Sequence, residues 1–291
     1  MRSIAYLGPE HTNTHVAAQK RFGRRCQYIH APTVDEVFHL VERRQANYGV
    51  VPIENSLAGS VTHTLDRFIN FVDTPVKIHG EIEQPIQHSL IVHRVAKLEK
   101  IGVVYSHPQA LAQCSQWLDT HLPNAQREET DSTAEAVAQV LNPFQWERWM
   151  ERSRHVTRGP RPYERAAIAR MELARERKLR AILIPQERDN KTRFLVLGLG
   201  EPKRAQRSKT SILFSVKDRP GALHDALLAF KRERINMTKI ESRPSKRKAW
   251  EYLFFIDIEG HESELRVKRA LAALQRSTSL LRVLGSYPVA R

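Results

Sequence analysis

The sequence predicts a largely buried α/β layer structure that is followed by a smaller, separate α/β module. Up to about residue 200, short apolar runs rich in Val, Ile and Leu alternate with longer amphipathic stretches, as buried strands alternate with helices. From residue 210 the order becomes strand, helix, strand, strand, helix, strand, which is the βαββαβ order of a ferredoxin-like sandwich. The polar segment 201–209, "EPKRAQRSK", predicts a linker between the two modules.

The first module contains several brief apolar runs that predict strands, and its helices carry recognisable start signals. Three segments have a hydroxyl residue followed three positions later by Glu or Gln, which predicts an N-terminal helix cap at Thr33, Ser106 and Ser132. Amphipathic helices are expected over 33–44 and 108–122. The expected strands are 3–8, 48–53, 88–92, 101–106, 181–185 and 193–200.

The second module is expected to have its own core over residues 210–291. Its helices are predicted at 220–233 and 262–277, and its strands at 210–216, 235–243, 250–260 and 279–287. Segment 142–165, with two Trp, three Pro and many Arg, fits neither pattern and is interpreted as an insertion without an assigned function.

Composition indicates an ordinary soluble protein with a strong positive charge. The chain has 291 residues, 41% hydrophobic and 27% charged, with a formal net charge of +15. No apolar run approaches the length of a membrane span, and no signal-peptide core is present at the N-terminus, so a cytoplasmic location without membrane contact is expected. Glutamates interrupt the basic segments, which favours a solvated surface over nucleic-acid binding. Cys26 and Cys114 are expected to be reduced and without a catalytic role.

Polar side chains gather where the predicted strands of the first module end. Ligands bind at the carboxyl ends of strands in open α/β sheets, and helix N-termini there attract anions. The sequence therefore predicts a site for a small anion, although several of these hydroxyls could instead be simple helix caps. No motif for a redox cofactor, a nucleotide or a metal is present, so no cofactor and no metal are expected. The polar residues are Thr12, Asn13, Thr14, Glu54, Asn55, Ser56, Ser106, His107, Gln109, Ser132 and Thr133.

Residues 189–198, "DNKTRFLVLG", place Thr192 and Arg193 at the mouth of an apolar run that predicts a central strand. An arginine beside a polar cleft can bind a carboxylate with two parallel hydrogen bonds, whereas at an ordinary strand edge it is merely solvated.

The ordered blocks "IAYLGPEHTNTHVAA", "GVVPIENSLAGSV", "VYSHPQALAQC", "DSTAEAVA" and "NKTRFLVLG" resemble those of the prephenate dehydratase family, in its monofunctional form with a regulatory ACT domain. The resemblance covers nearly the whole chain except 142–165. It implies two lobes like those of a periplasmic binding protein, with the active site between them. Lobe 1 is expected at about 1–78 and 181–200, lobe 2 at about 79–180, and the ACT domain at 210–291.

The resemblance implies conversion of prephenate to phenylpyruvate, water and carbon dioxide in phenylalanine biosynthesis, without cofactor. Thr192 would donate a hydrogen bond or proton to the departing hydroxyl, Arg193 would bind a substrate carboxylate, and Phe194 would shape the ring pocket. Glu54 would orient its neighbours. The remaining substrate contacts implied are Thr12, Thr14, Asn55, Ser56, Ser89, Ser106, His107, Gln109, Ser132 and Thr133.

Two departures from the family pattern leave the substrate open. His11 and Asn13 stand where the family has Gly and an aromatic residue, and Pro185 and Gln186 replace a Gln-Asp pair. Arogenate is the alternative substrate, and a non-catalytic amino-acid sensor or solute-binding protein is the alternative class.

Two segments of the second module, "DRPGALHDAL" and "KIESRPS", resemble the L-phenylalanine-binding motifs of ACT domains in this family. They imply feedback inhibition by L-phenylalanine bound across a subunit boundary, and hence a homodimer or homotetramer. A helix N-terminus at Pro220 and Gly221 suits the amino acid's carboxylate. The effector contacts expected are Gly221, Ala222, Leu223, His224, Glu241, Ser242, Arg243 and Pro244.

Overall fold

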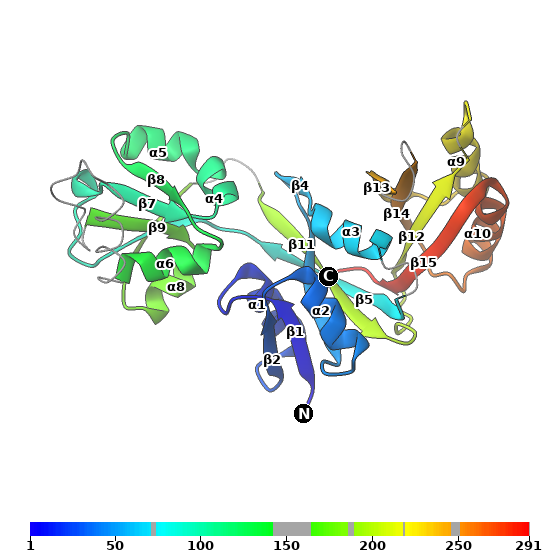
Figure 1. Cartoon of the computed structure of the whole chain (residues 1–291), viewed down its shortest axis with the longest axis horizontal. Coiled ribbons are helices and arrows are strands. Elements are labelled where there is room, and N and C mark those ends of the chain that lie inside the picture. Colours follow the sequence, from blue (N-terminus) through cyan, green and yellow to red (C-terminus); the bar gives the residue numbers. More distant parts are fainter. Residues whose placement is uncertain (71–73, 142–163, 186–188, 218, 246–250, 291) are drawn as a thin grey trace.

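The computed structural model describes residues 1–70, 74–141, 164–185, 189–217, 219–245 and 251–290. The described chain forms three bodies in a row (Figure 1). Lobe 1 lies in the middle, lobe 2 lies on one side of it, and the C-terminal domain lies on the other. The expected α/β class is confirmed.

Lobe 1 is a mixed sheet in the order β2-β1-β3-β11-β5, with the short β4 paired to β3. Strand β11 is antiparallel to both of its neighbours and lies between them. Helices α1 and α2 cover opposite faces, because the side chains that pack under them alternate along β3 and β11. The elements are β1 (Ser3–Leu7), α1 (Asn13–Phe22), β2 (Gln27–Ala31), α2 (Val34–Glu42), β3 (Tyr48–Asn55), β4 (Gly59–Ser60), α3 (Thr62–Asn70), β5 (Val76–Pro85) and β11 (Lys191–Leu199).

Lobe 2 is a five-stranded sheet in the order β10-β6-β9-β7-β8, and strand β9 at its centre is buried along its whole length. Segment 142–165, predicted as an insertion, lies almost wholly outside the described residues. The elements are β6 (Ser89–Val92), the 3₁₀ turn η1 (Leu98–Lys100), β7 (Val103–Ser106), α4 (Pro108–Gln113), α5 (Ser115–His121), β8 (Gln126–Glu129), α6 (Thr133–Leu141), β9 (Arg165–Ala169), α8 (Met171–Glu176) and β10 (Arg180–Leu183).

The C-terminal domain has the expected βαββαβ order, with its four strands arranged β13-β14-β12-β15. Helices α9 and α10 cover one face of this sheet and bury a core of their own with it. The other face is turned toward lobe 1. The elements are β12 (Ser208–Val216), α9 (Ala222–Arg232), β13 (Met237–Pro244), β14 (Tyr252–Glu259), α10 (Leu265–Ser277) and β15 (Thr278–Pro288).

Lobe 1 and the C-terminal domain share one hydrophobic core. Phe255 and Tyr287 from the C-terminal sheet belong to the same buried cluster as Phe68 and Ile78 of lobe 1. The rings of Phe68 and Phe255 have centroids 6.1 Å apart. Strand β15 approaches β5 so closely that a Cβ atom built on Gly285 would lie 2.3 Å from the Ile78 carbonyl oxygen. The two bodies are therefore packed together as one unit rather than tethered by a loose linker.

The boundaries between the three sheets fall at other residues than the lobe and linker boundaries expected from the sequence. Strand β5 continues in the lobe 1 sheet to Pro85, beyond the expected boundary at residue 78. On the return, β10 still belongs to lobe 2 up to Leu183, and β12 begins at Ser208, inside the expected linker. The lobe boundaries proposed from this structure are consequently 86–88 and 184–190.

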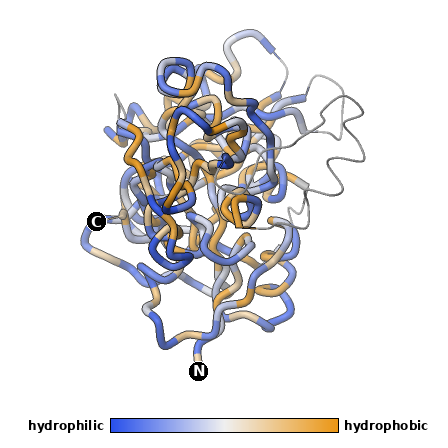
Figure 2. Tube along the Cα trace, turned by 90° about the vertical axis from the view of Figure 1, so that its left-hand side faces the viewer, coloured by the Kyte–Doolittle hydropathy of each residue, from blue (hydrophilic) through white to orange (hydrophobic). Residues whose placement is uncertain are grey.

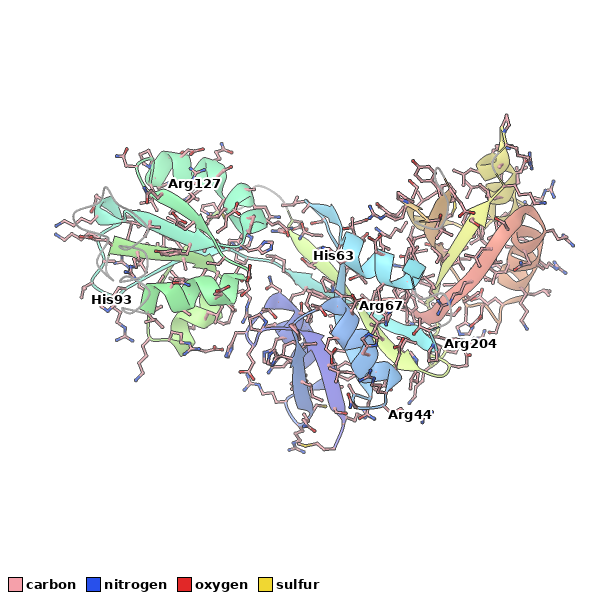
Figure 3. The ribbon with its side chains drawn as sticks, in the orientation of Figure 1. Arg44, His63, Arg67, His93, Arg127 and Arg204 are labelled. Atoms are coloured by element: carbon pink, nitrogen blue, oxygen red, sulfur yellow. The ribbon has the colours of Figure 1, made fainter. Side chains whose placement is uncertain are left out.

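Polar segments dominate the outline of the molecule, and apolar segments gather in its interior (Figure 2). Among the basic residues labelled in Figure 3, Arg127 lies on lobe 2, Arg44 on lobe 1 and Arg204 near the C-terminal domain, so these three are widely separated. Among the described helices, none is both long and apolar enough to cross a membrane.

The close approach of β15 to β5 predicts that Gly285→Ala lowers the unfolding free energy by about 1–3 kcal/mol, because the new methyl group meets backbone atoms that cannot move aside. Gly80→Ala is the matched control, since its methyl group would meet only Val196 at 3.9 Å, and it should stay within about 1 kcal/mol of wild type. Chemical denaturation of both variants measures the difference. Equal stability of the two would show that the contact between β15 and β5 is looser than described.

Candidate functional site

A cleft of about 500 Å³ lies between the two lobes. Its walls come from the loop before α1, from β3 and β11, and from the starts of α3, α4 and α6. His63, at the start of α3, lies in the middle of the molecule (Figure 3). A second hollow of about 1070 Å³ adjoins the cleft and shares Leu7, Gly8, Asp131 and Ser132 with it. The cleft has the size of a small-metabolite site.

Most of the substrate and catalytic residues expected from the sequence line this cleft, although they come from five separate stretches of the chain. Their convergence follows from the topology, because the two lobes present loops and helix starts to each other across the gap. The expected residues that line the cleft are Thr12, Thr14, Asn55, His107, Gln109, Ser132, Thr133, Thr192 and Phe194.

An irregularity in the pairing of β3 with β11 decides which side chains face the cleft. Thr192 pairs with Asn55, but Phe194 pairs with Pro52, so the register shifts between these two pairs. Pro52 and Asn55 both line the cleft although they are three residues apart, which simple alternation along a strand would not permit. The bulge therefore brings the Asn55 amide, rather than the Glu54 carboxylate, to the cleft.

Asn55 is the centre of a hydrogen-bond network at the base of the cleft. Its Nδ2 donates to Asn190 Oδ1 at 2.7 Å, and Asn190 Nδ2 donates to Gln113 Oε1 at 2.9 Å. Gln113 Nε2 lies 3.5 Å from Asn55 Oδ1 and completes the ring. His88 Nε2 lies 2.9 Å from Gln113 Oε1 and acts as the donor, because that oxygen can only accept. The ring joins lobe 1 to α4 of lobe 2.

Thr192 is held by the same network. Asn55 Nδ2 lies 3.0 Å from Thr192 Oγ1 and donates to it, since an amide nitrogen cannot accept. The Thr192 hydroxyl hydrogen has no acceptor among the described residues and is free to point into the cleft. A hydroxyl oxygen that accepts a hydrogen bond becomes a stronger donor, because linked hydrogen bonds polarise one another.

The cleft offers helix N-termini and neutral groups rather than cations. Helices α1, α3 and α6 begin at its wall, and the Ser132 hydroxyl accepts from the Glu135 amide at 3.0 Å to cap α6, as the sequence predicted. Among the described residues that line the cleft, none is Lys or Arg. An anion in this cleft would thus be held mainly by backbone N–H groups and helix dipoles.

Arg193 does not line the cleft, and the expectation that it binds a substrate carboxylate is wrong for this structure. Adjacent residues of a strand point to opposite faces, so Arg193 points away from the cleft that Thr192 and Phe194 face. Its guanidinium is buried against carboxylates of Glu54, at 2.8 Å, and of Glu81 and Asp257. Glu54 is likewise turned from the cleft, toward Arg193 and Lys239.

Three expected serines also lie outside the cleft lining. Ser56 Oγ donates to the Asp189 carbonyl and accepts from the Lys191 amide, both at 2.9 Å, and so fastens the turn after β3 to the start of β11. Ser106 is fully buried and donates to the Ile168 carbonyl at 2.7 Å, so the helix cap predicted there is instead His107. Ser89 is fully buried at the start of β6.

Several residues of the cleft lining were not among the contacts that the resemblance implied, among them Asn13, His88 and Gln113. Gln113 could have been found, since it stands four residues after Gln109 on a predicted helix and residues at this spacing share a face. Asn13 was among the polar residues that follow the first predicted strand, but it was not carried into the substrate contacts because it departs from the family pattern. His88 offered no signal beyond its place before an apolar run.

His11 keeps a backbone conformation that suits glycine. Its φ is +66°, in the left-handed region, so the residue departs from the family pattern while the loop geometry that favours Gly is retained. Its imidazole Nδ1 lies 2.9 Å from Glu176 Oε2 of α8 in lobe 2. His11 therefore contacts both sides of the gap between the lobes.

The expected effector residues lie on two parts of the C-terminal domain. Gly221 caps α9 with a φ of +76°, and His224 is exposed. On β13 the side chains alternate, so Ser242 and Pro244 are exposed while the residues between them turn toward lobe 1. Glu241 accepts a hydrogen bond from Ser60, and Arg243 binds both oxygens of Asp66. Direct contact of Glu241 and Arg243 with an effector stays a prediction, as do the contacts of Ala222 and Leu223.

Thiolate and metal chemistry find no support in the described residues. Cys26 and Cys114 are both free thiols. Burial raises the pKa of the Cys114 thiol to about 12, so it is protonated at neutral pH. No group of three or more His, Cys, Asp or Glu side chains suited to a metal ion occurs in the part of the chain that the structure describes.

Comparison with known proteins assigns both parts of the chain to families. The family model "Prephenate dehydratase" matches residues 4–202, and the family model "ACT domain" matches residues 210–276. A bifunctional chorismate mutase/prephenate dehydratase from Aquifex aeolicus is 45% identical over 290 residues, which are 99% of this chain and 74% of that protein. A prephenate dehydratase from Methanocaldococcus jannaschii is 35% identical over 99% of this chain and 98% of its own length.

Solved structures agree with these matches. The crystal structure of prephenate dehydratase in complex with L-Phe from Arthrobacter aurescens superposes with a TM-score of 0.84 at 33% identity, over 99% of this chain and 90% of that one. The prephenate dehydratase from Staphylococcus aureus gives a TM-score of 0.77 over 99% of this chain and 100% of its own, at 24% identity, which supports the fold alone.

The buried His88 makes the stability of the cleft dependent on pH. Burial lowers the pKa of His88 below its ordinary value of 6.5, so the unfolded chain binds a proton there that the folded chain does not. The contribution of His88 is therefore complete above about pH 6.5 and is lost as the pH falls, at no more than about 1.4 kcal/mol per pH unit.

His88→Gln keeps an N–H donor for Gln113 and removes the titration. We expect its unfolding free energy to fall less steeply between pH 7 and pH 5 than that of wild type, as measured by chemical denaturation at several pH values. His79, whose pKa burial also lowers, supplies a comparison in His79→Gln. A His88→Gln curve parallel to wild type would mean that His88 has the same pKa in the folded and the unfolded chain.

Proposed function

Because the chain belongs to the prephenate dehydratase family, we propose that it converts prephenate to phenylpyruvate in the cleft between the lobes, as a step toward L-phenylalanine. The observation that carries the proposal is the Thr192 hydroxyl, free to donate into a cleft of metabolite size and supported by Asn55. The sensor alternative does not account for this arrangement, because simple binding needs no activated hydroxyl.

The reaction requires two bonds of the ring to break. The bond from the ring to its carboxylate breaks and releases carbon dioxide, and its electron pair enters the ring. The bond from the opposite ring carbon to the hydroxyl breaks, its electron pair leaves with the oxygen, and the departing oxygen takes up a proton that comes from solvent to become water. The ring is aromatic at the end, which supplies the driving force, and no oxidant or reductant is consumed.

We assign Thr192 to the departing oxygen. Its hydroxyl is too weak an acid to transfer a proton unaided, but a hydrogen bond to the oxygen stabilises the negative charge that develops there. Asn55 strengthens that hydrogen bond by donating to Thr192 Oγ1. Phe194, almost fully buried in the cleft wall, would offer an apolar surface for the ring.

The N-termini of α1, α3 and α6 would hold the two substrate carboxylates, with Thr14 and Thr133 as neutral donors beside them. Closure of the lobes around the substrate would exclude water from the ring carboxylate and hold it ready to leave. No residue role here uses a metal ion or a coenzyme.

We further propose that L-phenylalanine inhibits the enzyme at the ACT domain and that the protein is a cytoplasmic homodimer or homotetramer. In a single chain, the hollow of about 370 Å³ on this domain includes only His224 among the expected effector residues. A second copy would supply the remaining contacts across a subunit boundary. Regulation is also supported by β13, whose inward side chains contact Ser60 and Asp66, since Ser60 itself lines the cleft.

Thr192→Val should lower kcat by about 100-fold or more, because it removes the donor to the departing oxygen while nearly preserving the shape of the side chain. Thr192→Ser keeps the hydroxyl and should retain most of the activity. Purified variants are incubated with prephenate and the phenylpyruvate formed is followed by absorbance. Turnover by Thr192→Val at the wild-type rate would remove Thr192 from the mechanism.

L-Phenylalanine should lower the rate of phenylpyruvate formation and raise the melting temperature, since a ligand that binds only the folded protein adds about 2.7 kcal/mol at a concentration 100 times its Kd. Ser242→Trp places a large side chain on the exposed face of β13 and should abolish both responses. Thr238→Trp, exposed on the same strand, should keep them. An L-phenylalanine response that survives Ser242→Trp unchanged would place the effector elsewhere.

A further inference from the structure

Arg193 is the centre of a buried charge cluster on the side of β11 that faces away from the cleft. Its Nη1 lies 2.8 Å from Asp257 Oδ2 and 3.0 Å from Glu81 Oε2, and its Nε lies 2.8 Å from Glu54 Oε1. The Arg193 side chain is 9% exposed, while those of Glu81 and Asp257 are 1% and 2% exposed. An arginine so enclosed is out of reach of a substrate in the cleft.

The three carboxylates come from three different strands. Glu54 is on β3 and Glu81 on β5, the two neighbours of β11 in the lobe 1 sheet. Asp257 is on β14 of the ACT domain, where it also accepts a hydrogen bond from Ser211 at 2.5 Å. The guanidinium of Arg193 therefore joins β11 to both neighbouring strands of its own sheet and, at the same point, to the ACT domain.

The cluster is balanced in charge only when the ACT domain is in place. Lobe 1 supplies Arg193, Glu54 and Glu81 to it, with a net charge of −1. The ACT domain supplies Asp257 together with two lysines, with a net charge of +1. One of these lysines contacts Glu81 at 2.9 Å and the other contacts Glu54; they are Lys209 and Lys239.

The position of Arg193 in the chain relates this cluster to the chemistry. Arg193 directly follows Thr192, and the shift in strand pairing that brings Asn55 beside Thr192 begins at the bond between Arg193 and Phe194. On one face of this segment the Arg193 guanidinium is held, and on the other the Thr192 hydroxyl lies 3.0 Å from Asn55 Nδ2. A bulge is a local interruption of the ladder hydrogen bonds, so side-chain contacts have to hold its geometry.

We propose that Arg193 is a positioning residue that holds β11 in register opposite the bulge in β3, and that Asp257 makes the ACT domain part of this support for Thr192. The inference rests on the proposed function for its kinetic consequences, but its structural part does not.

Electrostatics agrees with charged forms of Arg193 and Glu81. Burial alone would lower the pKa of Arg193, but the carboxylates of Asp257 and Glu54 outweigh it and raise that pKa above its ordinary value. Burial likewise opposes the charged form of Glu81, and Lys209 nevertheless lowers the pKa of this carboxyl. Arg193 and Glu81 thus keep their charges throughout the neutral range.

The test compares Asp257→Asn with Glu259→Gln. Asp257→Asn removes one negative charge from the cluster and keeps the size of the side chain, whereas Glu259 is exposed two residues along the same strand. In Asp257→Asn we expect kcat for prephenate to fall about 10- to 100-fold, because small displacements of a reacting group are costly. KM should stay within about twofold of wild type, since the Thr192 donor acts mainly in the transition state. Glu259→Gln should match wild type in both.

Hydrogen exchange supplies a readout that a merely structural role of Asp257 would not change. Backbone amides of residues 191–195 should exchange faster in Asp257→Asn than in wild type or Glu259→Gln, while those of 103–106 in lobe 2 should not change. Faster exchange confined to the ACT strands 208–216 and 252–259, or wild-type exchange and kcat in a folded Asp257→Asn, would overturn the proposal.

Arg193→Lys is the second variant, for the case that Asp257→Asn does not fold. It keeps the positive charge, but one ammonium group cannot reproduce the fork that contacts three carboxylates. Faster exchange at 191–195 supports the proposal and wild-type exchange overturns it. If the wild-type chain does not convert prephenate, the proposed function fails, and hydrogen exchange alone decides whether Arg193 positions the strand.

Discussion

The structure depends on strand β11, which has the cleft on one face and the packing against the ACT domain on the other. Side chains alternate along β11, so Thr192 and Phe194 face the cleft between the lobes while Arg193 and Leu195 face α2, α3 and the ACT domain. Because β11 lies between β3 and β5, neither of its faces can move independently of the sheet. Any change in the way the ACT domain packs on lobe 1 therefore acts on a strand whose opposite face carries the Thr192 hydroxyl.

The contact between the ACT domain and lobe 1 combines an apolar core with a charged centre, and the two have different roles. The shared core of Phe68, Ile78, Phe255 and Tyr287 supplies most of the stability, since buried apolar area is the dominant favourable contribution. Buried ion pairs add little net stability, because removing the charges from water costs about as much as their attraction returns. Their value lies in orientation, since Arg193, Glu81 and Glu54 of lobe 1 each pair with a different charged residue of the ACT sheet, which permits only a narrow range of placements of that sheet. The apolar surface holds the domains together, and the charges determine how they are aligned.

The fold class, the ferredoxin-like module and most of the cleft could be predicted, because strand-end polar residues and capping patterns are local signals. Arg193 was misplaced because the family motif suggested a role for three adjacent residues that one strand cannot present on one face. The bulge that brings Asn55 to Thr192 was beyond prediction, since it depends on pairing between segments more than 130 residues apart. Strand β5 was missed because polar residues interrupt its sequence, VKIHGEIEQP, so no apolar run identified it; one of them, Glu81, is buried against Lys209 of the ACT domain.

The distribution of hydrogen-bond donors in the cleft suits a reaction that starts from a carboxylate and ends with its loss. A lysine or arginine paired with the ring carboxylate would stabilise the substrate more than the transition state, because the negative charge leaves that group as carbon dioxide forms. Helix N-termini bind the same group more weakly, and the described residues that line the cleft provide them without any Lys or Arg. The directed donor is Thr192, which Asn55 supports and which we assign to the oxygen where the charge arrives. In the proposed reaction, strong donation at the oxygen that gains the charge and weak binding of the carboxylate that loses it favour the same direction of electron flow. The proposed support of Thr192 by Arg193 would give the ACT domain a physical means of controlling that flow.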